Sequence, residues 1–210
     1  MKGTLLLVLV LACLQSPGAS VAQSAVQTET VQSRQVKGQV LTSTHLPAIE
    51  IKFKDAFKYV GSQQFILYER AQVEQFFFVN ADSDRHIKSM YFVQFEGYLP
   101  GIDATYNYPV TETVTLAGQT YIVNAQAVPN VSSVLNQNPQ SDAARAVAFL
   151  KNKGYRMNES IRFQRFVRLV DDAKRNEILI IYIEDAGSSP VQELGKEFLT
   201  RALQGFTVEK

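Results

Sequence analysis

Three regularly spaced arginines form one set of side chains that could do chemistry. Arg162, Arg165 and Arg168 recur every third residue, and planar guanidinium groups bind phosphate, sulfate and carboxylate groups through paired hydrogen bonds. On a helix the three side chains would form one basic stripe, so they are a candidate anion-binding site. Acidic residues at 159, 171 and 172 are close in sequence, and we favour the competing interpretation of local ion pairs on a solvated face.

Aromatic side chains form a second candidate site, in this case for an apolar ligand. They fall on predicted strands, and a curved sheet with an aromatic face can enclose an apolar molecule while tyrosine hydroxyls orient it. The same pattern is typical of an ordinary hydrophobic core, which is the interpretation we favour. The candidate ligand-binding residues are Tyr68, Phe76, Phe78, Tyr91, Phe95 and Tyr98.

Motifs for catalysis are weak. A Ser-His-Asp mechanism would have to use one of the two histidines, His45 or His86. The arrangement to look for is His86 with Asp84 and a nucleophile such as Ser62. Adjacent carboxylates occur at 171–172 and 184–185, but neighbours on a helix or strand point in different directions. The sequence therefore leans away from an enzyme, and a hydrolase with scattered carboxylates remains an alternative.

Metal and cofactor motifs are incomplete. Asn80, Asp82, Asp84 and His86 alternate along the chain, which is the spacing of oxygen ligands in a calcium loop. Arg85 stands where that loop needs glycine, and residue 91 is not the required glutamate. The segment is better interpreted as a polar hairpin tip. Nothing matches a phosphate-binding glycine loop, so we expect no metal and no cofactor.

Composition indicates a globular chain. The 210 residues are 46% hydrophobic and carry 21 basic and 20 acidic side chains, for a formal net charge of +1. This balance excludes wholesale disorder and a fibrous repeat. It also gives no support for nucleic-acid binding, which relies on excess positive charge.

The first 22 residues have the order of a secretory signal peptide. Lys2 precedes an apolar run from Leu5 to Leu14, which is too short to span a bilayer, and small residues precede a cut after Ala22. Removing 22 of the 210 residues leaves 188, with no formal net charge and no cysteine. The alternative is a lipoprotein anchored at Cys13. We expect an exported protein, periplasmic or extracellular, with no transmembrane segment after cleavage.

The remaining chain predicts an α+β fold, a mainly antiparallel sheet with about three helices packed on one face. Residues 23–46 are rich in Gln, Ser, Thr and Val and are interpreted as a flexible arm, with a weak strand near Val36–Leu41 as an alternative. A single domain follows at 47–210. Helices are predicted at 141–153, 160–175 and 191–204. If residues 160–170 are instead a strand, the alternative is a closed β-barrel with a C-terminal helix. The predicted strands are 49–53, 59–68, 73–79, 87–98, 112–116, 120–127 and 178–183.

These observations favour an exported binding or accessory protein. Its ligand would be a small apolar or amphipathic molecule held between sheet and helices. The alternatives are a module that contacts another protein of the cell envelope, or the hydrolase described above.

Overall fold

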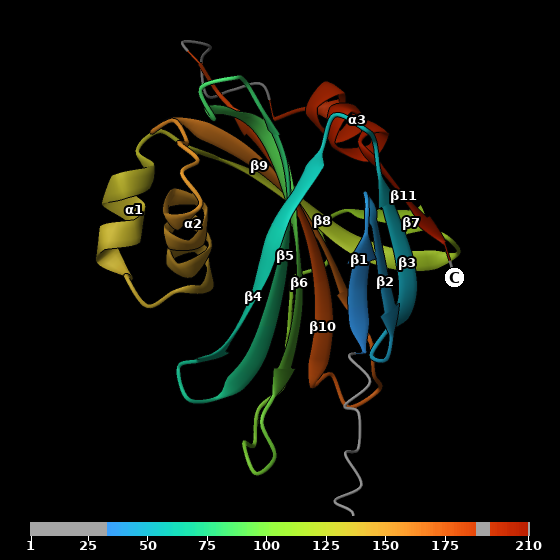
Figure 1. Ribbon diagram of the computed structural model, residues 1–210. Helices are drawn as coiled ribbons and strands as arrows, with labels where there is room; N and C mark the ends of the chain where they lie inside the picture. The colour runs from blue at the N-terminus through green and yellow to red at the C-terminus, as the bar shows by residue number, and fades with distance from the viewer. Residues whose placement is uncertain (1–32, 188–193, 210) are drawn as a thin grey trace, which may run out of the picture. The chain divides into compact units, whose positions relative to one another are not determined.

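A computed structural model of the chain describes residues 33–187 and 194–209 (Figure 1). All of them belong to one compact unit, residues 32–210. The other unit, residues 1–31, lies outside the described residues, together with the predicted signal peptide and Cys13.

The larger of two sheets has seven antiparallel strands in the order β4-β5-β6-β10-β9-β8-β7. Its two edge strands, β4 and β7, do not pair with each other, so the sheet is open and the alternative of a closed barrel is wrong. The strands are β4 (Lys58–Leu67), β5 (Ala71–Ala81), β6 (Ile87–Tyr98), β7 (Thr113–Leu116), β8 (Gln119–Val128), β9 (Ile161–Leu169) and β10 (Asn176–Asp185).

A smaller sheet has the order β1-β2-β3-β11. It comprises β1 (Arg34–Lys37), β2 (Val40–Thr44), β3 (Ala48–Phe53) and β11 (Phe206–Glu209). The described part of the predicted arm, residues 33–46, therefore differs from the expectation, because it contributes two paired strands. Leu41 of β2 is fully buried in the core, so even this segment of small and polar residues supplies a core side chain.

The three described helices lie on both faces of the large sheet. Helices α1 (Val131–Gln137) and α2 (Asp142–Asn152) cover one face, called here the α2 face, which includes Phe77 and Phe92. Helix α3 (Lys196–Gln204) and the small sheet cover the other, the α3 face, which includes Phe78 and Tyr91 (Figure 1). The α+β class holds, whereas packing of all helices on one face does not. None of these helices is long and apolar enough to cross a membrane.

The helix predicted at 160–175 is wrong, since residues 161–169 form β9. This strand lies between β8 and β10, and both of its faces are covered. Apolar residues therefore occur on both sides of the strand. Some of them also match the three- and four-residue spacing of an amphipathic helix, namely Phe163, Phe166, Val167 and Val170. Periodicity alone cannot separate a strand covered on both faces from a buried helix.

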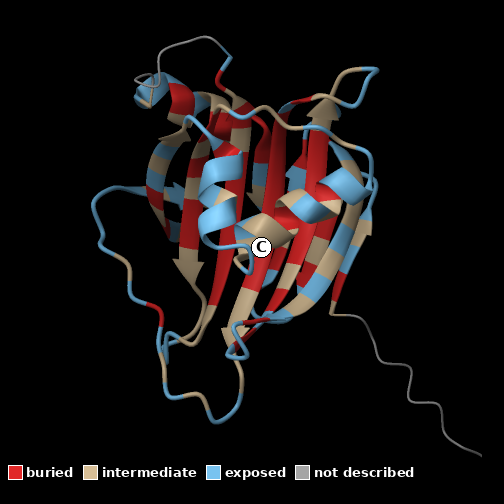
Figure 2. Ribbon diagram, turned by 90° about the vertical axis from the view of Figure 1, so that its left-hand side faces the viewer, coloured by how far each residue is buried: buried red, intermediate tan, exposed pale blue. Residues whose placement is uncertain are grey.

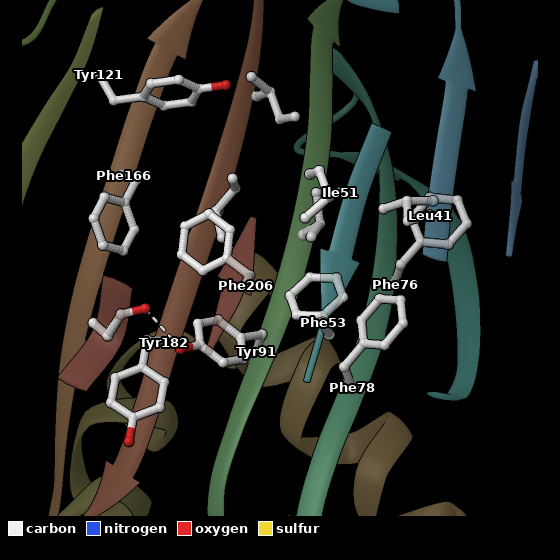
Figure 3. Close-up of a cluster of buried hydrophobic side chains, with 14 of the residues drawn as sticks. Leu41, Ile51, Phe53, Phe76, Phe78, Tyr91, Tyr121, Phe166, Tyr182 and Phe206 are labelled. Carbon is white, nitrogen blue, oxygen red and sulfur yellow. Dashed lines mark hydrogen bonds between the residues drawn. The ribbon is translucent and has the colours of Figure 1, made fainter. Parts of the chain in front are cut away.

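The core between the two sheets is aromatic (Figure 3). The rings of Phe53 and Phe78 stack with centroids 4.0 Å apart, and Tyr91 lies against Phe53 and Phe206. The Tyr91 hydroxyl donates a hydrogen bond of 2.7 Å to the backbone oxygen of Ala202 in α3. This bond ties the last helix to the centre of the large sheet.

Candidate functional site

A cavity of about 230 Å³ lies between the α2 face of the large sheet and the helices α1 and α2. Figure 2 shows the two helices in front of the buried strands that form its floor. The walls are mainly apolar, with Asp142 and Arg165 as the charged residues that line them. Representative lining residues are Phe92, Val134, Ala146, Phe163, Leu179 and Ile181.

Local signals place the two helices over this cavity. The side chain of Ser141 accepts a hydrogen bond from the backbone N–H of Ala144, which caps α2 and confirms the predicted start of that helix. Asn130 caps α1 in the same way. The Glu159 carboxylate accepts two hydrogen bonds from Ser132, which tie α1 to the segment before β9. Because α2 presents the small Ala146 toward the sheet, space remains beneath it.

Three carboxyl groups gather beside the cavity. Glu96 of β6 and Glu177 of β10 are direct partners in the antiparallel register, so both side chains project from the same sheet face. Glu177 has the same orientation as Leu179 two residues along β10, which lines the cavity. Asp142, the first residue of α2, lines the cavity itself. These three residues are called the acidic cluster below.

Hydrogen-bond donors surround the acidic cluster. Tyr106 and Tyr108, from the loop between β6 and β7, donate to Glu96 at 2.9 Å and to Glu177 at 3.0 Å. The side-chain amide of Gln94 donates to Glu96 at 2.7 Å and to Asp142 at 3.1 Å. The loop and β6 therefore supply neutral donors that hold the carboxyl groups in place.

Burial dominates the electrostatics of the site. Glu177 is 2% exposed, and desolvation raises the pKa of its carboxyl to about 8, opposed mainly by the Tyr108 hydrogen bond. Burial also raises the pKa of Glu96 above its ordinary range. One Glu177 oxygen, Oε2, is buried without a hydrogen-bond partner among the described residues. Arg165 favours the charged form of Glu177, while its Nε donates to Asn124.

The aromatic candidate residues lie elsewhere. Phe76, Phe78 and Tyr91 are buried in the core between the two sheets, on the α3 face, and Phe95 shares that face. Figure 3 shows the first three packed among side chains of the small sheet. Tyr68 lies at the turn after β4, is half exposed, and its hydroxyl accepts a hydrogen bond from Asn138.

The last two aromatic candidates, Phe95 and Tyr98, line a second cavity of about 310 Å³. There the guanidinium of Arg34 covers the ring of Phe95 at 4.0 Å and pairs with Glu74 at 2.7 Å. Arg34 also donates to two backbone oxygens before β3. These bonds join the small sheet to the large one, so the polar groups of this cavity already serve packing.

The three candidate arginines do not converge, because their segment is a strand. Successive residues of a strand alternate in direction, so Arg165 faces the α2 side while Arg162 and Arg168 face the α3 side. Arg162 and Arg168 are about 20 Å apart along β9 at the usual rise per residue. Arg162 is buried and pairs with Glu184 of β10 at 3.1 Å. This pair differs from the expected local pairs on a solvated face, because it is buried and joins neighbouring strands.

The residues considered for catalysis and calcium binding form ordinary structural contacts. Ser62 pairs with Phe76 and Ile87 with Ala81, which separates Ser62 from Ile87, the neighbour of His86, by about 17 Å along the strand direction alone. The Asp82 carboxylate accepts hydrogen bonds from the backbone N–H groups of Asp84 and His86, and these bonds lower its pKa. This is a turn, and within the residues that the structure describes no group of three or more His, Cys, Asp or Glu side chains could hold a metal ion.

Sequence reasoning missed the acidic cluster. The only local signal is that Glu96 and Glu177 border apolar strand runs, where a charged residue normally marks a strand end. Their pairing depends on the register of β6 against β10. Asp142 lies in the predicted helix at 141–153, and the sequence does not show that this helix brings it to the two glutamates.

Comparison with known proteins finds no matching family model, no matching curated protein and no matching solved structure. The geometry of the site therefore carries the functional argument.

Proposed function

We propose that this chain is an exported binding protein that holds a small amphipathic ligand in the cavity under α1 and α2. The observation that carries the proposal is an apolar cavity of about 230 Å³ that borders a buried set of polar groups. Ligand sites typically combine an apolar wall with a few placed polar groups that fix orientation. The volume is below the roughly 300–1,000 Å³ of sites for drug-sized ligands, so the ligand is small.

Binding of 1-hexanol, followed by isothermal titration calorimetry, tests this proposal. Ala143 lines the cavity and is also exposed at the start of α2, so Ala143→Phe places a ring at the cavity wall without disturbing the core. The expected result is that the wild-type chain binds hexanol and the variant does not. Ala148→Phe is the matched control, because Ala148 lies on the same helix and is exposed away from the cavity.

Equal binding by all three proteins would place the ligand elsewhere and contradict the proposal, as would no binding to the wild type. Native mass spectrometry of protein purified from the exported compartment adds a second check. A retained small molecule supports the proposal, whereas a retained protein partner would favour an envelope interaction module instead.

Export is the part of the proposal that rests on the sequence. Cleavage after Ala22 predicts an intact mass that matches residues 23–210. A lipid-modified mass that begins at Cys13 would instead support the lipoprotein alternative.

A further inference from the structure

We propose that the ligand of this cavity is an amphipathic amine, whose ammonium group binds at the acidic cluster while its apolar part fills the space under α2. This inference rests on the proposed function, because it names the chemical class of ligand for the same cavity.

The charge balance of the cluster is incomplete. Three carboxyl groups gather here, and like charges placed directly opposite each other on a sheet are destabilising. Arg165 is the cation whose charge acts on Glu177. In the described part of the chain the ion pairs join Arg34 to Glu74, and Arg162 and Arg201 to Glu184, and none reaches the cluster. An added cation would therefore stabilise the charged form of these carboxyl groups, which burial disfavours.

The unused acceptor is Glu177 Oε2. The other oxygen of this carboxyl accepts from Tyr108, but Oε2 is buried and has no partner among the described residues. A buried polar atom left without a hydrogen bond is costly, and such atoms are rare in native proteins. An ammonium group provides three donors and a positive charge, which would satisfy Oε2 and still reach a second carboxyl oxygen.

The cation is organic rather than a metal ion, because of what surrounds the cluster. The carboxyl groups are not arranged as a metal site in the described residues. Asp142 belongs both to the cluster and to the cavity wall. Leu179, also on the wall, is about 7 Å along β10 from Glu177 on the same sheet face. An amine with a short alkyl chain can therefore place its two ends in these two environments.

Proton exchange should accompany binding. The groups that face Glu177 are Glu96 of β6, Asp142 of α2, Arg165 of β9 and Tyr108 of the loop after β6. An ammonium group beside Glu177 favours its charged form. At pH 7 a carboxyl whose pKa is about 8 is mostly protonated, so the complex forms with release of a proton. Amine affinity should rise from pH 6 to pH 8.

The test compares three probes of one chain length, n-hexylamine, 1-hexanol and hexanoate, by calorimetry at pH 7. Hydrogen bonds to charged groups are strong enough to predict that the wild type binds hexylamine about 10- to 100-fold more tightly than hexanol. Hexanoate should bind more weakly than hexanol, because the cluster repels an anion.

Glu177→Gln is the informative variant. It preserves size and an acceptor for Tyr108 but removes the charge, so the preference for hexylamine over hexanol and the pH dependence of that preference should both be lost. Glu96→Gln is a second variant on the opposite strand with the same expected direction. Circular dichroism checks that both variants fold.

The outcomes separate this inference from the function on which it rests. If hexanol and hexylamine bind equally and Ala143→Phe abolishes both, the cavity is a ligand site and the amine inference is overturned. A preference for hexylamine that survives both Glu177→Gln and Glu96→Gln also overturns it. If no probe binds the wild type, the proposed function itself fails.

Discussion

Replacing Glu177 by glutamine should flatten the dependence of protein stability on pH. Burial is the main reason why the pKa of this carboxyl rises from its ordinary 4.5 to about 8 in the folded chain. The folded state therefore binds more protons than the unfolded state between these two values. The contribution of protonated Glu177 to stability is fully present below pH 4.5 and is lost as the pH rises through 8.

The size of the effect follows from the shift. Between pH 5 and pH 7, proton linkage for this one carboxyl lowers the free energy of unfolding by about 2.5 kcal/mol. Glu96 also lowers the free energy of unfolding as the pH rises, because burial raises the pKa of its carboxyl too. The free energy of unfolding of the Glu177→Gln variant should therefore fall less steeply with pH. Its stability relative to wild type should improve by about 2.5 kcal/mol between pH 5 and pH 7.

Urea denaturation of the ligand-free proteins at several pH values, followed by circular dichroism, measures this difference. Glu112→Gln is the matched control, because Glu112 is an exposed carboxyl outside the acidic cluster. Its curve of stability against pH should follow the wild type. Parallel curves for wild type and Glu177→Gln would refute the reasoning, since they would mean that Glu177 is charged at pH 7 in the folded chain.

Three further predictions concern the elements that hold the fold together. Tyr91→Phe should cost about 1 kcal/mol of stability in urea denaturation, because it removes the buried hydroxyl that donates a hydrogen bond to the backbone oxygen of Ala202. An unchanged midpoint would contradict this. Gly205→Ala should cost about 1–3 kcal/mol, seen as a lower melting temperature, because a Cβ there would overlap the Tyr91 ring; wild-type stability would show that α3 can shift freely. Ser141→Ala should cost about 1 kcal/mol by removing the bond to the N–H of Ala144, whereas the same loss from Ser141→Thr would argue against capping as the cause.

Local patterns predicted most of the elements because their causes are local. Residues 87–98 are predicted as a strand and form β6, and the predicted hairpin tip lies between β5 and β6. The predicted strands at 112–116 and 120–127 correspond to β7 and β8, which pair with each other. The short turns and the alternation of apolar residues identify these pairs. Ser141 marks the start of α2 for the same kind of reason, since its cap bond reaches only three residues along the chain.

The errors arose where neighbours across the fold decide the outcome. Residues 161–169 have apolar side chains on both sides because β9 is covered on both faces, and this resembles a helix when the strand is considered alone. The first described strands, β1 and β2, have few large hydrophobes. β1 pairs with β2 and β2 pairs with β3, so their placement depends on backbone pairing across the small sheet and on the burial of Leu41.

The sequence by itself determined the α+β class, the antiparallel hairpins and the helix at α2, because each depends on residues close together in the chain. Only the tertiary structure decided which faces the helices cover and which polar groups meet. Glu96 and Glu177 lie far apart in sequence and are neighbours through the register of β6 and β10, while Asp142 joins them because α2 packs across that face. Side chains converge through strand register and helix packing, and these are long-range properties that short sequence patterns do not encode.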